Sequence, residues 1–263
     1  MSEMLSRRKL ITTGLAAAAG ASGLGVAATL ADRYGLIPPD YGGIYGIGET
    51  LTYAAQRVLT SGQSLAREFD RSQISKVSPV NGPPPVNETY QRLLSDGFRD
   101  WRLSFDGLVA RPSSFSLEEL RRLPARSQIT LHVCEEGWSF IAEWTGVQLS
   151  YVLNLVGVRP EAKYVVFFPF EQVDQQTRNT QVWWDSLDMA DAMHPQTILT
   201  LGMNGSTLPV PFGGPLRMRV PRQLGYKSVK YVASLTVTDD IKKFGQGLGS
   251  SAPEGGYAWY AGI

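Results

Sequence analysis

Cysteine is almost absent from this sequence, and Cys134 is the only one among 263 residues. A single cysteine cannot form a disulfide within the chain or supply the four thiolates of a zinc or iron–sulfur site. Covalent haem is excluded as well, because no Cys-x-x-Cys-His motif occurs. Cys134 is therefore either a small buried side chain or a single functional thiolate. Composition alone favours the buried side chain, since free cysteine is among the most buried residue types.

An excess of charge of either sign is also missing. The 25 Lys and Arg residues nearly balance 24 Asp and Glu residues, for a net charge of +1. This balance gives no reason to expect nucleic acid or an acidic membrane surface as a partner. Histidine is scarce, with only His132 and His194. Together with Cys134 they leave a zinc site short of ligands, although His132 and Cys134 on one strand would point the same way and permit a Cys/His pair.

The N-terminus has the form of an export signal. Arg7-Arg8 is a twin-arginine pattern, and residues 10–31 contain no charge and are rich in Ala, Gly and Ser. We therefore expect export to the periplasm by the twin-arginine route, with a membrane tether if the signal is not cleaved. That route carries folded proteins, which favours a cofactor inserted before export. The alternative is an anchoring or amphipathic helix of a cytoplasmic protein.

The remaining chain divides at a proline-rich segment. We expect a signal segment at residues 1–31, an N-terminal helix and proline-rich arm at 32–85, and one main domain at 86–263. Three prolines at 83–85 favour an extended strap or linker. In the arm, Thr50 is expected to cap a helix that ends near Leu59.

The main domain alternates short strands with short helices. Ser116 and Glu119 form a capping box before one helix, and Ser186 is expected to cap another that ends at Met193. Asn204-Gly205 predicts a hairpin. Because no regular βαβ alternation occurs, the pattern predicts an α+β domain with mixed β-sheets. Strands are expected at residues 101–109, 128–133, 164–168, 199–203, 208–210, 217–220 and 231–238.

Several ordered motifs resemble one family. Residues 134–139, Cys-Glu-Glu-Gly-Trp-Ser, and residues 144–149 resemble the cofactor loop of the sulfite-oxidase-type molybdopterin domain. The similarity continues through residues 192–195, through Gly214-Pro215-Leu216-Arg217 and through residues 225–230. The layout is most similar to the twin-arginine-exported periplasmic branch, which includes methionine-sulfoxide reductase catalytic subunits.

The resemblance implies a Mo-molybdopterin cofactor whose molybdenum is ligated by the Cys134 thiolate. A soft anionic sulfur suits a high-valent metal that is already held by a dithiolene. The resemblance also implies a set of pterin contacts, namely Asn87, Tyr90, Gln91, Arg217, Ser228, Val229 and Lys230. Pro169 and Phe212 depart from the reductase branch, which has Thr and Asn at these positions, so two side-chain hydrogen bonds are lost or supplied differently.

The expected activity is oxygen-atom transfer at a cysteine-ligated molybdenum centre, with reduction of an S- or N-oxide such as methionine sulfoxide. The oxide is either a small molecule or part of a protein. Sulfite oxidation is the alternative reaction, and a cofactor-free binding protein with a buried structural Cys134 is the alternative of another class. A membrane haem protein or a cytochrome is the expected electron partner. We expect a monomer, because few residues follow the last predicted strand.

Overall fold

The computed structural model describes residues 29–31, 35–40, 46–59, 64–170 and 183–263. The predicted signal segment lies almost wholly outside these residues, and the domain boundaries at residues 31 and 85 stay predictions. Within the described ranges, no helix is long and apolar enough to cross a membrane.

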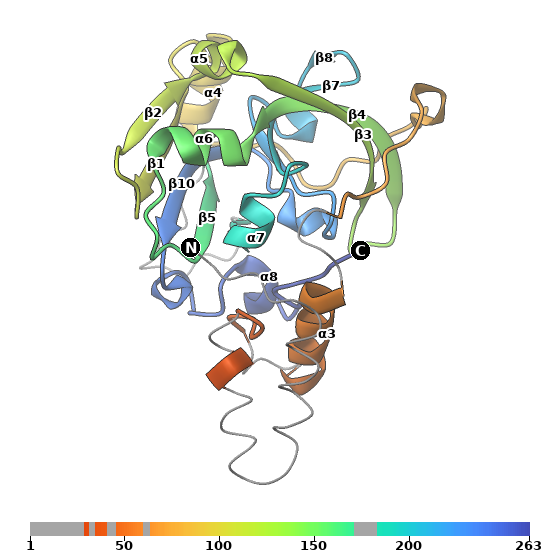
Figure 1. Ribbon diagram of the computed structural model, residues 1–263. Coiled ribbons are helices and arrows are strands. Elements are labelled where there is room, and N and C mark those ends of the chain that lie inside the picture. The colour runs from red at the N-terminus through yellow and green to blue at the C-terminus, as the bar shows by residue number, and fades with distance from the viewer. Residues whose placement is uncertain (1–28, 32–34, 41–45, 60–63, 171–182) are drawn as a thin grey trace, which may run out of the picture.

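Two five-stranded sheets form the centre of the molecule (Figure 1). One sheet has the order β2-β1-β10-β5-β6, in which β1 and β10 are parallel and the other neighbours are antiparallel. The other has the order β3-β4-β7-β8, with β9 paired to β7. This arrangement confirms the predicted α+β class with mixed sheets. The strands are β1 Arg102–Gly107, β2 Ser113–Ser116, β3 Ala125–Val133, β4 Ser139–Gln148, β5 Tyr164–Pro169, β6 Asp185–Asp188, β7 Ile198–Met203, β8 Ser206–Thr207, β9 Arg217–Arg219 and β10 Val232–Thr238.

The helices are short and lie around the sheets, except for α3 beside the C-terminal segment (Figure 1). They are α3 Gly46–Leu59, α4 Glu88–Ser95, α5 Leu117–Arg122, α6 Leu149–Val156, α7 Met189–Ala192 and α8 Ser251–Glu254, with 3-10 turns η1 Arg71–Gln73, η2 Val210–Phe212, η3 Gly225–Lys227 and η4 Ile241–Lys243.

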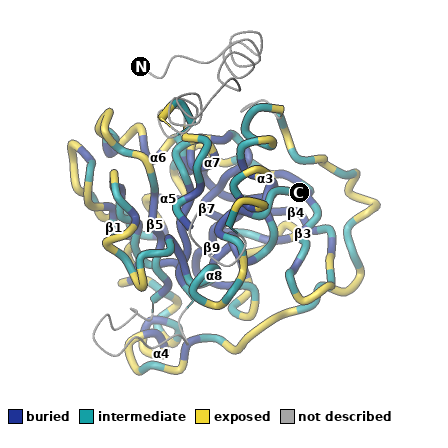
Figure 2. Tube along the Cα trace, turned by 90° about the horizontal axis from the view of Figure 1, so that it is seen from below, coloured by how far each residue is buried: buried dark blue, intermediate teal, exposed yellow. Residues whose placement is uncertain are grey.

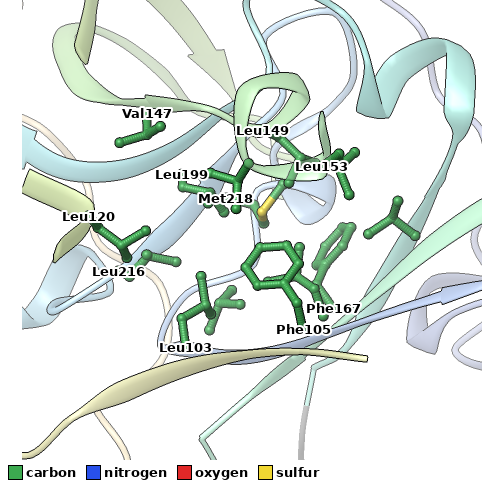
Figure 3. Close-up of a cluster of buried hydrophobic side chains, with 14 of the residues drawn as sticks. Leu103, Phe105, Leu120, Val147, Leu149, Leu153, Phe167, Leu199, Leu216 and Met218 are labelled. Atoms are coloured by element: carbon green, nitrogen blue, oxygen red, sulfur yellow. The ribbon is translucent and has the colours of Figure 1, made fainter. Parts of the chain in front are cut away.

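One apolar core joins the two sheets. Leu103 and Phe105 of β1 pack in the same cluster as Leu199 of β7 and Met218 of β9, and α6 adds Leu153 (Figure 3). All five side chains are at most 1% exposed. Buried positions run through the central strands and exposed positions gather at the periphery (Figure 2). The sheets therefore form one rigid scaffold, and the loops at their ends can hold a site in fixed positions.

The residues predicted to cap two helices, Thr50 and Ser186, are not the N-caps of those helices. Thr50 lies inside α3, where its hydroxyl donates to the Gly46 carbonyl, so it is not a cap. Ser186 lies in β6, and Asp188 caps α7 by accepting a hydrogen bond from the Asp191 amide. For α7 a position two residues further on satisfies the helix N-terminus, which local preference alone cannot distinguish.

The capping box and the hairpin were predicted correctly. Ser116 accepts a hydrogen bond from the Glu119 amide, and the Glu119 carboxylate accepts one from the Ser116 amide. Asn204 and Gly205 adopt φ values of 51° and 78°, as a two-residue hairpin turn requires. The second hairpin strand is Ser206–Thr207, however, and the expected strand at 208–210 runs into the 3-10 turn η2.

The arm before the main domain lies against it. The Phe69 amide donates to the Ile129 carbonyl of β3 at 2.9 Å, and the Ser75 amide donates to the Ile141 carbonyl of β4 at 2.9 Å. Gln196 holds both the amide and the carbonyl of Ala66. The segment is thus a strap across the β3–β4 hairpin, one of the two roles that its prolines predicted.

A buried carboxyl pair attaches α3 to the C-terminal segment. Asp40 and Glu49 each accept a hydrogen bond from the single Trp259 amide, at 2.8 and 2.9 Å. Burial is the largest cause that raises the pKa of Glu49, and the neighbouring Asp40 raises it further, to about 8. Two carboxyl groups that share one donor cannot both ionise cheaply, so the contact favours a protonated Glu49 at neutral pH.

This pair makes the stability of the protein depend on pH. Folded Glu49 binds its proton up to about pH 8, whereas its ordinary pKa is 4.5. Unfolding between these values releases a proton, so the free energy of unfolding falls as pH rises, by up to about 1.4 kcal/mol per pH unit. We expect Glu49→Gln to flatten this slope in urea titrations at pH 5–8. The exposed Glu161→Gln control should keep it, and an unchanged slope in Glu49→Gln would contradict the assignment.

A buried ion pair holds η3 against β6. The Lys227 ammonium lies 2.6 Å from the Asp185 carboxylate, and both side chains are fully buried. We expect Lys227→Met to lower the free energy of unfolding by about 3–5 kcal/mol, because it leaves Asp185 buried without its partner. Denaturant titration measures this loss. Lys242→Met, at an exposed position of η4, should change stability by less than about 0.5 kcal/mol; equal effects of the two variants would refute the ion-pair argument.

Candidate active site

Cys134 is the first residue of the turn that joins β3 to β4. Its amide donates to the Trp138 carbonyl at 2.9 Å, and the Gly137 amide donates to the Cys134 carbonyl at 3.1 Å. Gly137 has φ = 90°, in the left-handed region that favours glycine. The long β3–β4 ladder and these two hydrogen bonds fix the position of the cysteine, which explains the need for a Gly three residues after it.

The thiol of Cys134 is protonated in the cofactor-free chain. It is 4% exposed, and it donates a hydrogen bond to the Glu135 carboxylate at 3.3 Å. Burial, and then the Glu135 and Glu136 carboxylates, raise the pKa of Cys134 to about 12. A bound cation would reverse this effect, because a coordinated thiol loses its proton. The site therefore suits a metal-bound thiolate better than a free nucleophile, which needs a lowered pKa.

Two arginines of β9 lie on the indole of Trp144. The Arg217 and Arg219 guanidinium carbons are 5.1 and 5.5 Å from the ring centroid. Their side chains share one face of the strand, while Met218 between them points into the core. Arg217 donates to the Phe212 carbonyl at 2.9 Å and to the Ser228 carbonyl at 2.8 Å. Burial lowers the pKa of Arg217 to about 10.

Lys230 extends the positive charge toward the strap. Its ammonium donates to the Asn81 carbonyl at 2.5 Å and to the Pro211 carbonyl at 3.1 Å. Burial and the nearby Arg217 lower the pKa of Lys230 to about 8. The close packing requires glycine at position 213, because a Cβ there would lie 2.8 Å from the Lys230 Cβ.

The structure brings most of the predicted pterin contacts together. Tyr90 is fully buried, its hydroxyl donates to the Gly214 carbonyl at 2.6 Å, and its ring meets that of Tyr231 edge-on at 5.6 Å. Ser228 accepts from the Val220 amide, and the buried Val229 accepts from the Met218 amide. These contacts fix the segment 228–230 beside β9.

Asn87 and Gln91 make local contacts, one at the N-terminus of α4 and the other with the proline-rich segment before it. The Asn87 side chain accepts a hydrogen bond from the Tyr90 amide and caps α4, and the Gln91 side chain donates to the Pro85 carbonyl. Gln91 is exposed. Their roles in cofactor binding stay predictions, because both side chains have a structural partner of their own.

His132 lies on β3, two residues before Cys134, and its ring packs among aromatic side chains. Its ring is 5.1 Å from that of Phe140 and 5.9 Å from that of Trp138. Burial, and then Arg217 and Arg219, lower the pKa of His132, which keeps the ring neutral. Gly225 approaches it so closely that a Cβ at position 225 would lie 2.7 Å from the ring nitrogen Nε2. No Cys/His pair forms, since the Cys134 thiol donates to Glu135 instead.

Pro169 and Phe212 are the two positions at which the chain departs from the reductase branch, and neither offers a polar side chain. Pro169 ends β5 and pairs with Val232, so its ring occupies a strand position. Phe212 contacts Phe140 edge-on at 6.1 Å, and its carbonyl, in place of a polar side chain, accepts from Arg217.

Arg219 is the site residue that the sequence motifs did not single out. The signal was present in the alternation Arg217-Met218-Arg219, which places both arginines on one face of a strand.

The site fits an anionic cofactor that carries a metal. Arg217 and Arg219 are buried without an ion-pair partner among the described residues, and their Nε atoms, like Nδ1 of His132, have no hydrogen-bond partner there. A buried cation without a counter-charge is costly, and an anionic ligand removes that cost. Cys134 adds a soft donor of the kind that molybdenum accepts. The phosphate and dithiolene of molybdopterin match both features.

The raised pKa of Cys134 predicts slow alkylation of the cofactor-free protein. At pH 8.5 the folded chain should hold far less thiolate than the unfolded chain, since the ordinary cysteine pKa is 9.0 and the folded value is about 12. We expect iodoacetamide to label folded Cys134 at least about 100-fold more slowly than the urea-unfolded chain, as followed by mass spectrometry. Equal rates in the two states would contradict the protonated, buried thiol.

The chain is similar to known molybdopterin proteins. Residues 91–244 match the family model described as the oxidoreductase molybdopterin binding domain. A relative from Azospira oryzae, named "Putative protein-methionine-sulfoxide reductase subunit YedZ1", is 37% identical over 199 residues, which are 74% of this chain and 70% of that protein. The protein-methionine-sulfoxide reductase catalytic subunit of Xanthomonas campestris is 36% identical over 147 residues, which are 54% of this chain and 46% of that protein.

A solved structure is also similar in part. The sulfane dehydrogenase SoxCD from Paracoccus pantotrophus has a TM-score of 0.48 and 27% identity, over 54% of this chain and 39% of that chain. The family assignment rests on the sequence comparisons, in which the model spans more than half of the chain and the Azospira relative is matched over 70% of its length. The chain belongs to the oxidoreductase molybdopterin-binding domain family, and it is a molybdopterin-dependent oxidoreductase.

Proposed function

We propose that this protein reduces a sulfoxide, with protein-bound methionine sulfoxide as the substrate, by oxygen-atom transfer at a molybdenum ion ligated by Cys134. The observation that carries the proposal is the fixed position of Cys134 beside buried arginines that lack carboxylate partners. The names of the Azospira and Xanthomonas relatives support the choice of substrate.

Different residues of the site would hold the phosphate end of the cofactor and its metal. Molybdopterin, when bound, supplies a metal that changes oxidation state while oxygen is transferred. Arg217 offers a planar fork of donors to a phosphate, and Lys230 adds a flexible ammonium. The Ser228–Lys230 segment, fixed by Val220 and Met218, presents its backbone to the same anionic end. The turn fixed by the Cys134 and Gly137 amides would hold the Cys134 thiolate in place as the protein's ligand to the metal.

The side chains around the cysteine turn favour a neutral, partly apolar substrate. Trp138 and Phe140 stack at 6.0 Å, and Phe212 packs on Phe140, so an apolar wall lies next to the turn. Glu135 and Glu136 flank the same turn, and Glu136 accepts a hydrogen bond from the Trp138 ring at 2.8 Å. Two carboxylates beside the metal ligand repel the sulfite anion but not a neutral sulfoxide.

The cellular context is part of the proposal. The twin-arginine pattern at Arg7-Arg8 supports export to the periplasm. The one cysteine of the chain is assigned to molybdenum, so we propose that electrons come from a separate redox protein. A membrane haem protein or a cytochrome is suitable for that role.

Metal and activity assays test the function. We expect protein expressed with ample molybdate to contain about one molybdenum per chain and to reduce methionine sulfoxide with a reduced viologen dye as donor. Cys134→Ser should lower turnover at least about 100-fold, because a hydroxyl is a poor substitute for a soft thiolate. Ser127→Ala, at an exposed position of β3 in the same hairpin, is the matched control and should keep wild-type turnover.

Three results would overturn parts of this proposal. Protein without molybdenum would support the cofactor-free binding protein instead. Full turnover in Cys134→Ser would remove the cysteine as metal ligand. Turnover with sulfite alone would assign the chain to the sulfite-oxidising alternative.

A further inference from the structure

Arg219 is the most deeply buried arginine of the described chain. Its side chain is 1% exposed, and one terminal nitrogen, Nη2, donates to the Leu131 carbonyl at 2.6 Å and to the Thr130 hydroxyl at 3.1 Å. The Nε atom is buried and has no partner among the described residues. One edge of the guanidinium is therefore held by β3, and another edge still offers a hydrogen-bond donor.

Away from this site, two buried or nearly buried cations of the described chain are paired with carboxylates. Arg57 contacts Asp188 and Asp191, and Lys227 contacts Asp185. Arg219 differs, because it has no ion pair with a carboxylate of the described residues and the charge that shifts its pKa is the like charge of Arg217. Burial and this repulsion lower the pKa of Arg219 to about 9. If Arg219 only linked two strands, a second unpaired guanidinium on the same indole would add charge repulsion and would not stabilise the fold.

The geometry of β9 directs both guanidinium groups to one place. Arg217 and Arg219 are two residues apart on the strand, and both lie over the Trp144 ring, at 5.1 and 5.5 Å. Their strand neighbours, Thr200 and Ile198 of β7, are successive inward positions of the same sheet. The Thr200 hydroxyl is also buried without a partner. Thr200, the β7 neighbour of Arg217, thus adds a further buried polar group without a partner among the described residues.

We propose that Arg219 binds the anionic, phosphate-bearing end of molybdopterin together with Arg217, so that two arginines on Trp144 clamp one ligand. This inference rests on the proposed function and adds a residue to it. Arg217 and Arg219 each keep an Nε donor without a partner among the described residues. Two guanidinium groups that donate to the same phosphate give a tighter and more directional grip than one arginine and a lysine. The unpaired charge of the cofactor-free site is then neutralised on binding.

Cofactor-free and cofactor-loaded forms of the full chain test the clamp. We would compare wild type with Arg219→Met and Arg219→Lys, measuring pterin and molybdenum per chain and the thermal midpoint of each form. For Arg219→Met we expect a cofactor-free midpoint equal to or above that of wild type, because a buried unpaired charge is gone. In wild type, bound cofactor should raise the thermal midpoint, and in Arg219→Met most of this rise should be absent. Loaded Arg219→Met should also release pterin at least about tenfold faster than loaded wild type.

Arg126→Met is the matched control, since Arg126 lies on β3 but is paired with Glu68. It should bind cofactor as wild type does. A purely structural Arg219 would give the opposite pattern, with a lower midpoint in both forms and wild-type pterin content, and this result would overturn the clamp.

The two proposals fail in different ways. Wild-type protein without molybdenum or pterin would overturn the proposed function, and the clamp with it. Wild-type protein with full cofactor, and Arg219→Met with equal content and release rate, would overturn only the clamp. If Arg219→Met does not fold, Arg219→Lys decides: reduced pterin with an unchanged cofactor-free midpoint supports the clamp, and unchanged pterin overturns it.

Discussion

The contact on which this site depends is the stacking of two buried guanidinium groups on the indole of Trp144. Burying a cation without a carboxylate costs free energy, and here Arg217 and Arg219 lie next to each other, so that their repulsion adds to the cost. The aromatic face and a few backbone carbonyls offset part of it. Such an arrangement needs a further interaction to offset its cost, and the anionic cofactor that we propose at this position would provide that interaction.

The surrounding structure keeps other charges from neutralising the site. Lys227 and Asp185 satisfy each other within the core, and Arg57 is engaged by Asp188 and by Asp191 at α7. These closed pairs attach η3 and α3 to β6 and α7. Glu135 and Glu136 lie in the cysteine turn, beside the proposed metal ligand, and neither forms an ion pair with Arg217 or Arg219.

Local signals were predicted well where the physical cause was local. The capping box at Ser116 and the hairpin at Asn204 each depend on contacts within four residues, so the sequence contained all the information. Predictions failed where a tertiary contact decided the outcome. Ser186 pairs with Val166 in the ladder between β6 and β5, so it lies in a strand and does not cap the helix.

The sequence by itself determined the family and its ordered motifs, and with them Cys134 as the candidate metal ligand and Arg217 and Lys230 as candidate phosphate contacts. Those assignments follow from the resemblance of the motifs to the family. Only the tertiary structure points to Arg219 as a further contact, because an arginine on a strand is ordinarily paired with a carboxylate or exposed to solvent. Only the packing of β9 against Trp144 shows that its charge is buried, unpaired and adjacent to a second one.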